Sequence, residues 1–179
     1  MNKNVLIIAT SPRKGGNSEL LADEFARGAL DAGNNVEKIS TYDKTVNFCR
    51  GCLACQKTRR CIINDDTRYI CKKMQNSDII VFATPIYFYE MCGQMKTILD
   101  RTNPLFPSEY MFRDIYLLAT AADTDKNAMD GAIKGLQGWI DCFEKTKLKG
   151  IIRGLGLEEI GAINGNPSLC EAYNLGKSV

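Results

Sequence analysis

The segment 11–18 has the composition of an anion-binding loop. It reads SPRKGGNS, and a segment with helical spacing of apolar residues follows it. Backbone N–H groups and the dipole of that helix can converge on a phosphate, and Ser11, Asn17 and Ser18 add side-chain donors. The spacing differs from the G-x-x-x-x-G-K-[ST] of nucleoside triphosphate sites and from the G-x-G-x-x-G of dinucleotide sites. The loop therefore favours a monophosphate, with a plain strand-to-helix turn capped by Asn17 or Ser18 as the alternative.

Three consecutive aromatic residues, 87–89 (YFY), follow an apolar run that ends at Thr84 and Pro85. A planar ring could lie against aromatic side chains at such a strand end. The alternatives are core contacts at the start of the next helix and a subunit interface.

A cluster of cysteines lies in a long segment between the second and third apolar runs. Cys49, Cys52, Cys55 and Cys61 follow the pattern C-x2-C-x2-C-x5-C, so their four thiols could surround one metal centre. The spacing is near that of [4Fe-4S] ligation. Four thiolates could also hold zinc, and the cysteines could instead be small buried apolar residues. The remaining cysteines are scattered on expected helices or their ends and are predicted to be packing residues: Cys71, Cys92, Cys142 and Cys170.

The charges are mixed, with 23 basic and 21 acidic residues, so neither a nucleic-acid face nor a membrane-surface patch is expected. Lys57, Arg59 and Arg60 could meet an acidic electron-transfer partner or a nucleotide phosphate, or could form a solvated loop. The apolar run 5–9 is too short for a membrane span or a signal peptide, which predicts a cytoplasmic protein with reduced thiols or metal-bound cysteines. Because the chain has no histidine, a cofactor rather than a catalytic side chain is expected to supply the chemistry.

Short apolar runs alternate with amphipathic segments, which predicts a single α/β domain over residues 1–179. The expected strands are 4–10, 36–41, 78–84, 114–120 and 148–153, and the expected helices are 19–30, 67–75, 92–101, 127–145 and 167–177. Pro85 is expected to end the third strand, and Asn166 to cap the last helix. Five strands of this kind fit a parallel, doubly wound sheet of order 2-1-3-4-5, in which a ligand lies outside the carboxyl ends of strands one and three.

The segments 11–18 and 84–88 together resemble the NADPH-dependent FMN reductase-like branch of the flavodoxin-like proteins. In that branch a Ser-Pro-Arg-x-Gly-Gly-Asn-Ser loop and a Thr-Pro-Ile-Tyr-Phe loop recur, and the resemblance continues through the helix at 93–101 and covers nearly the whole chain. It implies a flavodoxin-like fold and bound FMN. The implied phosphate contacts are Ser11, Arg13, Asn17 and Ser18, and the implied ring contacts are Pro85, Ile86, Tyr87 and Phe88. A further contact is implied after strand four, where the segment 120–123, including Thr120 and Ala121, is less glycine-rich than in relatives.

The resemblance implies an NAD(P)H oxidoreductase in which hydride passes from the nicotinamide to the flavin and on to a small acceptor such as a flavin or a quinone. The cysteine segment also resembles the compact motif of iron-sulfur flavoproteins, a branch of the same family. This implies the alternative of an electron carrier that works through FMN and a [4Fe-4S] cluster with a redox protein as partner. A metal or thiol sensor without flavin is a third hypothesis. By the same resemblance, a homodimer or homotetramer is expected.

Overall fold

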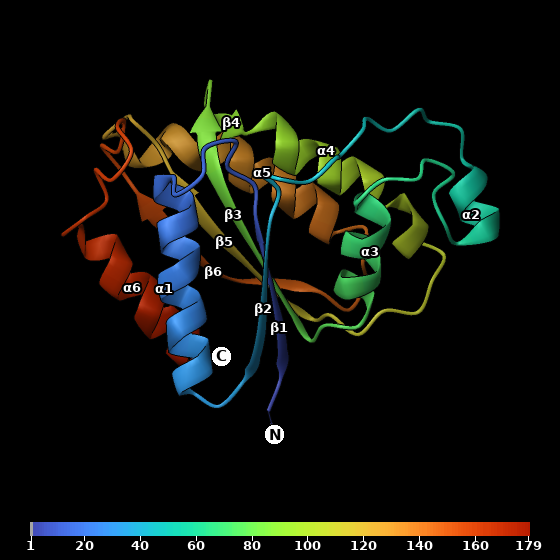
Figure 1. Cartoon of the computed structure of the whole chain (residues 1–179), viewed down its shortest axis with the longest axis horizontal. Helices are drawn as coiled ribbons and strands as arrows, with labels where there is room; N and C mark the ends of the chain where they lie inside the picture. The colour runs from blue at the N-terminus through green and yellow to red at the C-terminus, as the bar shows by residue number, and fades with distance from the viewer. Residues whose placement is uncertain (1) are drawn as a thin grey trace.

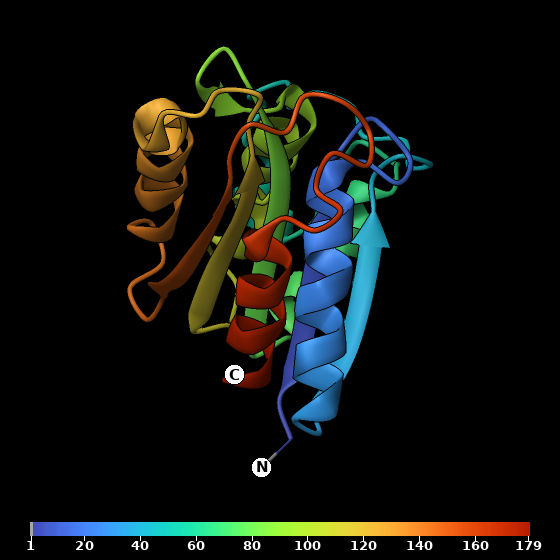
Figure 2. The same ribbon diagram turned by 90° about the vertical axis from the view of Figure 1, so that its left-hand side faces the viewer.

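The computed structural model describes residues 2–179 and has three layers, with a central β-sheet covered by helices on both faces (Figure 1, Figure 2). Five parallel strands run in the order β2-β1-β3-β5-β6. They are β1 (Asn4–Ala9), β2 (Asn35–Ser40), β3 (Ile79–Tyr87), β5 (Asp114–Thr120) and β6 (Lys147–Gly154). This is the expected doubly wound order, so the carboxyl ends of β1 and β3 are neighbours.

The sheet has a sixth strand, β4 (Glu90–Met91), which the expectation of five strands missed. It pairs antiparallel with the end of β3, which continues through Pro85 to Tyr87. The expectation that Pro85 ends the strand is therefore wrong. Pairing between β1 and β3 stops at Ala9 and Ala83, so Pro85 lies where β3 has an open edge and its missing N–H interrupts no ladder.

The helices that cover the sheet are α1 (Asn17–Asp31), α2 (Ala54–Thr58), α3 (Thr67–Gln75), α4 (Gly93–Arg101), α5 (Asp130–Ile140) and α6 (Pro167–Lys177). The short helix α2 was not expected. Asn166 caps α6 as expected, because its side chain accepts a hydrogen bond from the N–H of Ser168 at 3.0 Å. Within residues 2–179, none of the helices has the length and apolar character needed to cross a membrane.

The helix expected over 127–145 is wrong at both ends. A 3-10 turn, Lys126–Met129, precedes α5, and α5 ends at Ile140. The hydroxyl of Thr146 donates hydrogen bonds to the carbonyl oxygens of Ile140 at 3.1 Å and Phe143 at 2.8 Å. The same carbonyl oxygens accept the backbone N–H groups of Phe143 at 2.8 Å and Thr146 at 3.0 Å, so the chain continues in three-residue turns and not in the four-residue ladder of a longer α-helix.

Two apolar cores lie on the two faces of the sheet, as expected for a parallel sheet whose strands are buried on both sides. In β1, Leu6 and Ile8 pack into the core beneath α3, α4 and α5. Val5 and Ile7, which alternate with them, pack into the core beneath α1 and α6. The near-continuous apolar sequence of β1 follows from this double burial.

Helices α1 and α6 approach closely through two glycines. A Cβ atom on Gly28 would lie 2.0 Å from the carbonyl oxygen of Tyr173, and one on Gly176 would lie 2.1 Å from the carbonyl oxygen of Phe25. No larger residue fits at either position without moving the backbone. The helix that follows the loop 11–18 is therefore fixed against the last helix of the chain (Figure 2).

Candidate functional site

A cavity of about 150 Å³ lies at the carboxyl ends of β1 and β3. The loop before α1, the end of β3 and the loop before α6 meet at this edge of the sheet (Figure 1). Eight of the ten contact residues expected from the sequence line the cavity: Ser11, Arg13, Asn17, Ser18, Pro85, Ile86, Tyr87 and Thr120. The structure thus brings together residues from three separate segments of the chain.

The loop 11–18 is shaped by a local hydrogen-bond pattern. The hydroxyl of Ser11 accepts a hydrogen bond from the N–H of Arg13 and donates one to its carbonyl oxygen, both at 3.0 Å. A Cβ atom on Gly16 would lie 2.7 Å from the Ser11 Oγ atom, so glycine is required there. Gly15 adopts a φ of +66°, which also favours glycine, and its N–H donates to the carboxylate of Glu19 at 2.8 Å. Two adjacent glycines are therefore needed for the loop conformation itself.

The first turn of α1 leaves hydrogen-bond donors free at the cavity. Its N-cap is Gly16, not Asn17 or Ser18, and no side chain caps the helix. The backbone N–H groups of Asn17 and Ser18 and the hydroxyl of Ser18 have no acceptor within residues 2–179. Arg13 lines the same wall, and its guanidinium donates one long bond of 3.4 Å to the carbonyl of Glu158. Free donors at a helix N-terminus beside a guanidinium are an arrangement that can bind an anion.

The side chain of Asn17 attaches a distant loop to this first turn. Its amide nitrogen donates to the carbonyl oxygens of Leu157 at 3.3 Å and Glu159 at 2.8 Å. Its amide oxygen accepts from the N–H groups of Gly161 at 3.1 Å and Ile163 at 3.3 Å. Both donors and both acceptor positions of the amide are used. The Asn17 side chain therefore positions a wall of the cavity, while its backbone N–H stays available.

Sequence reasoning missed this wall. Beyond the expected residues, the cavity is lined by Gly16, Ala122, Leu157, Glu158 and Ile160. The last three belong to the segment 155–166, which follows β6 and contains glycines with positive φ at 156, 161 and 165. A glycine-rich segment after the last strand is the signal that could have identified a structured loop here.

The other side of the cavity is an aromatic strand end. β3 and β4 are joined by a two-residue turn, Phe88–Tyr89, with φ values of +51° and +64°. Positive φ at both positions is typical of a hairpin turn that usually contains asparagine and glycine, so two aromatic residues there are strained. Phe88 is 98% exposed and does not line the cavity, whereas Tyr87 does and is 40% exposed. The turn therefore presents an aromatic side chain beyond the rim of the cavity.

The loop after β5 forms the third segment of the site. Thr120 lines the cavity as expected, but Ala122 does so in place of Ala121, which is buried. The backbone of Ala121 explains this, because its N–H donates to the carbonyl of Gly154 at the end of β6 at 2.9 Å, and its carbonyl accepts from the N–H of Leu157 at 2.8 Å. Asp123 accepts a long hydrogen bond of 3.4 Å from the hydroxyl of Tyr89.

Buried polar groups fix the two strand ends beneath the cavity. The Cys92 thiol lies 3.2 Å from the carbonyl oxygen of Thr10, and the Thr84 hydroxyl lies 3.4 Å from the Cys92 sulfur. The Thr10 hydroxyl donates to the carbonyl oxygen of Ala83 at 2.8 Å. Thr10, Thr84 and Cys92 are completely buried, so this network joins β1, β3 and the start of α4 without solvent.

The four clustered cysteines lie on the loop 41–66, which contains α2 and projects from the sheet (Figure 1). Cys49 and Cys52 are exposed, Cys61 is half-buried and Cys55 is buried. Burial raises the pKa of the Cys55 thiol, and negative charge on the other three thiols raises it further. Across residues 2–179, no three Cys, His, Asp or Glu side chains are placed to hold one metal ion. The donor types suit an iron-sulfur or zinc centre, but their positions are not gathered around one point.

A buried ion pair anchors both ends of that loop. Arg101 of α4 donates to the carboxylate of Asp65 at 2.8 and 2.9 Å and to the carbonyl oxygen of Asn47. The Asp65 carboxylate also accepts from the N–H groups of Asn47 at 2.9 Å and Thr67 at 3.2 Å. Burial alone would raise the pKa of Asp65, but these hydrogen bonds, that of Arg101 first, hold it well below its usual range.

The cysteines outside the cluster were all expected to be packing residues. This is confirmed for Cys71 and Cys92, which are buried, and burial raises the pKa of the Cys71 thiol to about 12. It is wrong for Cys142 and Cys170, which are exposed. Cys142 lies beyond the end of α5, and Cys170 lies on the outer side of α6.

The fold and the cavity define a doubly wound α/β protein with free hydrogen-bond donors and an aromatic strand end at its switch point. Residues 3–140 match the family described as NADPH-dependent FMN reductase, and the chain belongs to that family. The family expected from the sequence is thus confirmed, and the expected oxidoreductase class and FMN cofactor are those of the family.

Individual relatives agree with the family assignment. An iron-sulfur flavoprotein of Methanocaldococcus jannaschii is 40% identical over 101 residues, which is 56% of this chain and 52% of that protein. An iron-sulfur flavoprotein of Methanosarcina thermophila is 27% identical over 134 residues, or 74% of this chain and 70% of that protein. The chain spans about half the length of the first curated relatives it matches. The solved NAD(P)H:quinone oxidoreductase from Methanothermobacter marburgensis has the same fold, with a TM-score of 0.74, 13% identity, and coverage of 99% of this chain and 97% of that one.

Proposed function

We propose that the protein is an FMN-dependent oxidoreductase that takes reducing equivalents from NADH or NADPH and passes them to a small acceptor such as a flavin or a quinone. The observation that carries this proposal is the placement of free donors on Ser18 and the start of α1 across one cavity from the aromatic end of β3. A flavin mononucleotide has the matching pair of groups, a terminal phosphate and a planar ring.

The phosphate of FMN would be held by the N–H groups of Asn17 and Ser18, the Ser18 hydroxyl and Arg13. These donors have no charged partner within residues 2–179, so the phosphate would complete their hydrogen bonds. Pro85, Ile86 and Tyr87 would support the ring, with Phe88 beyond them. The cavity of about 150 Å³ is smaller than a ligand of this kind usually needs, so the ring would extend over the open surface at the strand end.

Bound FMN would supply the hydride and electron transfer. The chain's own residues bind the flavin and orient it, and the chain has no histidine that could act as an acid or base. The network of Thr10, Thr84 and Cys92 keeps the two strand ends in fixed register. The open side toward Tyr87 and Phe88 leaves room for a nicotinamide and then for an acceptor, one after the other.

The proposal also covers the domain organisation, the location and the oligomeric state of the protein. We expect residues 1–179 to act as one FMN-binding domain in the cytoplasm, where the reducing environment suits eight free thiols. We also expect a homodimer or homotetramer, which the 98% exposed Phe88 at the rim of the site supports, because large exposed aromatic residues are enriched at interfaces.

The direct test is an anaerobic purification followed by a visible spectrum and the addition of NADH or NADPH. Flavin bands that bleach on addition of either nucleotide, and recover with a quinone, are the expected result. A colourless protein that cannot be reconstituted with FMN would refute the proposal. Such a protein would support the third hypothesis, a thiol or metal sensor.

A second candidate function is an electron carrier that combines FMN with an iron-sulfur cluster. The supporting observation is that Cys49, Cys52, Cys55 and Cys61 share one loop whose ends are tied together by Asp65 and Arg101. Several relatives of the chain are named iron-sulfur flavoproteins. Iron and acid-labile sulfide in the anaerobic protein, lost together when Cys52 and Cys55 are replaced by serine, are expected for this function. A flavin that bleaches only with a protein or chemical donor would favour it over the first.

A further inference from the structure

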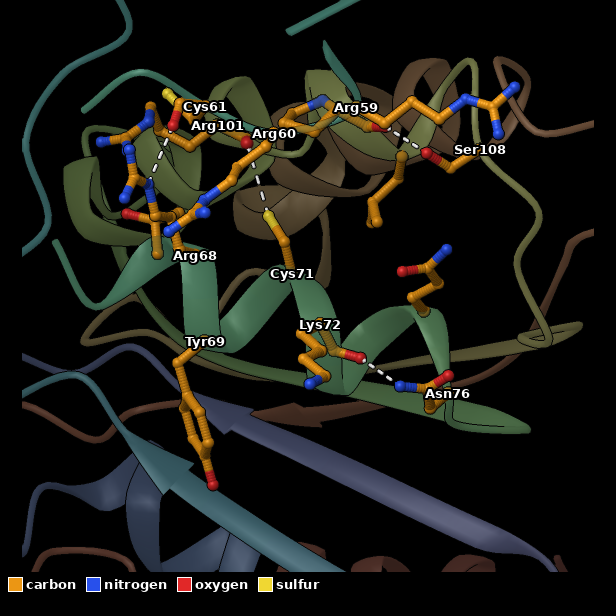
Figure 3. Close-up of a pocket in the computed structure, with 14 residues that line it drawn as sticks. Arg59, Arg60, Cys61, Arg68, Tyr69, Cys71, Lys72, Asn76, Arg101 and Ser108 are labelled. Atoms are coloured by element: carbon orange, nitrogen blue, oxygen red, sulfur yellow. Dashed lines mark hydrogen bonds between the residues drawn. The ribbon is translucent and has the colours of Figure 1, made fainter. Parts of the chain in front are cut away.

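A second and larger cavity, of about 680 Å³, runs along α3 and shares no lining residue with the candidate flavin site. One wall is the outer face of α3, a second is the end of the cysteine loop, and a third is the segment after α4 (Figure 3). The lining residues of α3 include pairs one turn apart, Thr67 with Arg68 and Cys71 with Lys72, and the lining continues through Gln75 to the C-cap residue Asn76, with Tyr69 also in the wall. The cavity is therefore a groove along the whole of α3.

The wall of this groove has an unbalanced positive charge. Arg59, Arg60, Arg68 and Lys72 line it, and none of them has an ion pair within residues 2–179. Arg68 makes hydrogen bonds only to neutral oxygens, at 2.6 to 3.0 Å. Among the described residues, 2–179, no Asp or Glu lines the groove. Four cations around one concave surface repel one another unless an anion lies between them.

Two buried side chains in the same wall have unsatisfied polar atoms. The Nε atom of Arg101 and the hydroxyl of Thr67 lie in residues that are each 1% exposed, and neither atom has a hydrogen-bond partner in residues 2–179. Both residues line the groove. The remaining nitrogens of Arg101 are already bonded to Asp65 and to backbone oxygens. Unpaired buried polar atoms are costly, and these two belong to residues of the groove wall.

The shape and chemistry of the groove indicate the class of ligand. Its volume lies within the range of small-molecule sites and is far larger than a single phosphate ion needs. Pro104 and Leu105 provide an apolar surface, and Asn76 lies away from the arginines (Figure 3). Guanidinium groups bind phosphate oxygens in pairs with well-defined geometry.

We propose that this groove is a binding site for a phosphorylated organic molecule of mononucleotide size, separate from the flavin site. The phosphate groups are bound by the cations that line the groove, among them Arg59, Arg60 and Lys72. The organic part lies along Pro104 and Leu105. Because the site is independent of the cavity at β1 and β3, it does not require the proposed flavin chemistry.

The test is calorimetric titration of the protein with ADP, used as a probe of this class, in low-salt and high-salt buffer. ADP is expected to bind, with affinity that falls as salt rises. Adenosine, which lacks the phosphates, and pyrophosphate, which lacks the organic part, are each expected to bind at least about tenfold more weakly. The double variant Arg59→Gln with Arg60→Gln is expected to weaken ADP binding by at least about tenfold, and Lys72→Gln should weaken it as well. These three side chains are exposed, so the fold should be retained.

Two control variants locate the binding. The first pair, Lys134→Gln with Lys145→Gln, removes two exposed cations that line neither cavity, and ADP affinity should stay unchanged. The second, Arg13→Gln, removes a cation of the flavin site and should also leave it unchanged. Loss of ADP binding with Arg13→Gln, or equal loss with the lysine pair, would overturn the proposal. So would equal binding of adenosine or pyrophosphate, or no binding of ADP to the unmodified protein.

Discussion

The carboxylate of Asp65 faces the guanidinium of Arg101 with two hydrogen bonds, at 2.8 and 2.9 Å, and neither side chain is accessible to solvent. Arg101 lies at the end of α4 and Asp65 just before α3, so the pair joins two helices and closes the base of the cysteine loop between them. The same Arg101 also has an unpaired Nε in the wall of the basic groove. One buried pair therefore supports both the loop and the groove.

Breaking this ion pair should lower the stability of the folded protein. Asp65→Asn leaves the Arg101 charge buried without a counter-charge, and we expect the free energy of unfolding to fall by about 3–5 kcal/mol. Urea unfolding at neutral pH measures the change. Asp100→Asn is the matched control, since its pair with Lys96 is exposed and should contribute less than about 1 kcal/mol. Equal effects of the two substitutions would contradict the assigned role of Asp65.

The same ion pair predicts that the stability of the protein depends on pH. The pKa of Asp65 is lower in the folded protein than in the unfolded chain, where an aspartate titrates near about 4. The unfolded state therefore takes up the proton first as pH falls, and the stabilisation by Asp65 is complete above that pH and is lost below it. The stability difference between the unmodified protein and Asp65→Asn should stay constant from neutral pH down to about 5 and then shrink. A stability difference that grows toward acid pH would show that folding raises the pKa of Asp65 and does not lower it.

Ser18 and Asn17 should behave differently although they are neighbours. Ser18→Ala removes a free hydroxyl from the cavity, so we expect FMN affinity to fall about tenfold with little change in stability. Asn17→Ala removes four hydrogen bonds to the loop before α6, so we expect stability to fall by about 1–3 kcal/mol. Fluorescence titration with FMN and urea unfolding separate the two effects. Ser178→Ala, on the exposed end of α6, serves as control.

Phe88 should show a trade-off between stability and binding. Asparagine is better suited to its φ of +51°, so Phe88→Asn is expected to stabilise the isolated subunit by about 0.5–1 kcal/mol. The same substitution removes the aromatic side chain beyond the ring position and should weaken FMN binding. Tyr89→Phe, which loses only a hydrogen bond of 3.4 Å, is the control. A loss of stability in Phe88→Asn, together with dissociation in sedimentation, would place Phe88 in a subunit interface instead.

Thiol reactivity should follow burial. Cys49, Cys52, Cys142 and Cys170 are exposed and should react with a chromogenic disulfide reagent in the folded, metal-free protein at neutral pH. Cys71 and Cys92 are buried, and the Cys71 pKa of about 12 leaves almost no thiolate, so these two should react only after unfolding. Mass spectrometry of partly labelled protein identifies the order in which the cysteines react. Early labelling of Cys71 would contradict the packing of α3 against α4.

Local patterns in the sequence predicted the main elements well. The helix 67–75 and the strand 114–120 occur with the expected bounds, because their apolar spacing and flanking residues agree. The continuation of β3 past Pro85 was missed, because it depends on where the neighbouring strand β1 ends. The short helix α2 was missed because it lies between two residues with positive φ, Leu53 and Arg59, which no local pattern predicts.

The candidate site was predictable where its residues follow strand ends. Most of its expected residues line one cavity because parallel strands end at the same edge of the sheet. Leu157, Glu158 and Ile160 were missed, since the wall they form depends on hydrogen bonds from Asn17, about 140 residues away in the chain. The basic groove was missed for a similar reason, because it exists only where the segment after α4 packs beside α3.

The bonds of Asn17 make the last quarter of the chain a structural component of the first loop. The segment 157–163 lies beyond residues 3–140, the stretch that matches the family, yet it forms one wall of the cavity that the loop 11–18 opens. Truncation before residue 157 would therefore disrupt the loop 11–18 and would not merely shorten the C-terminal end of the chain. Opening of α6 and release of a ligand from the first turn of α1 should then occur as one cooperative event.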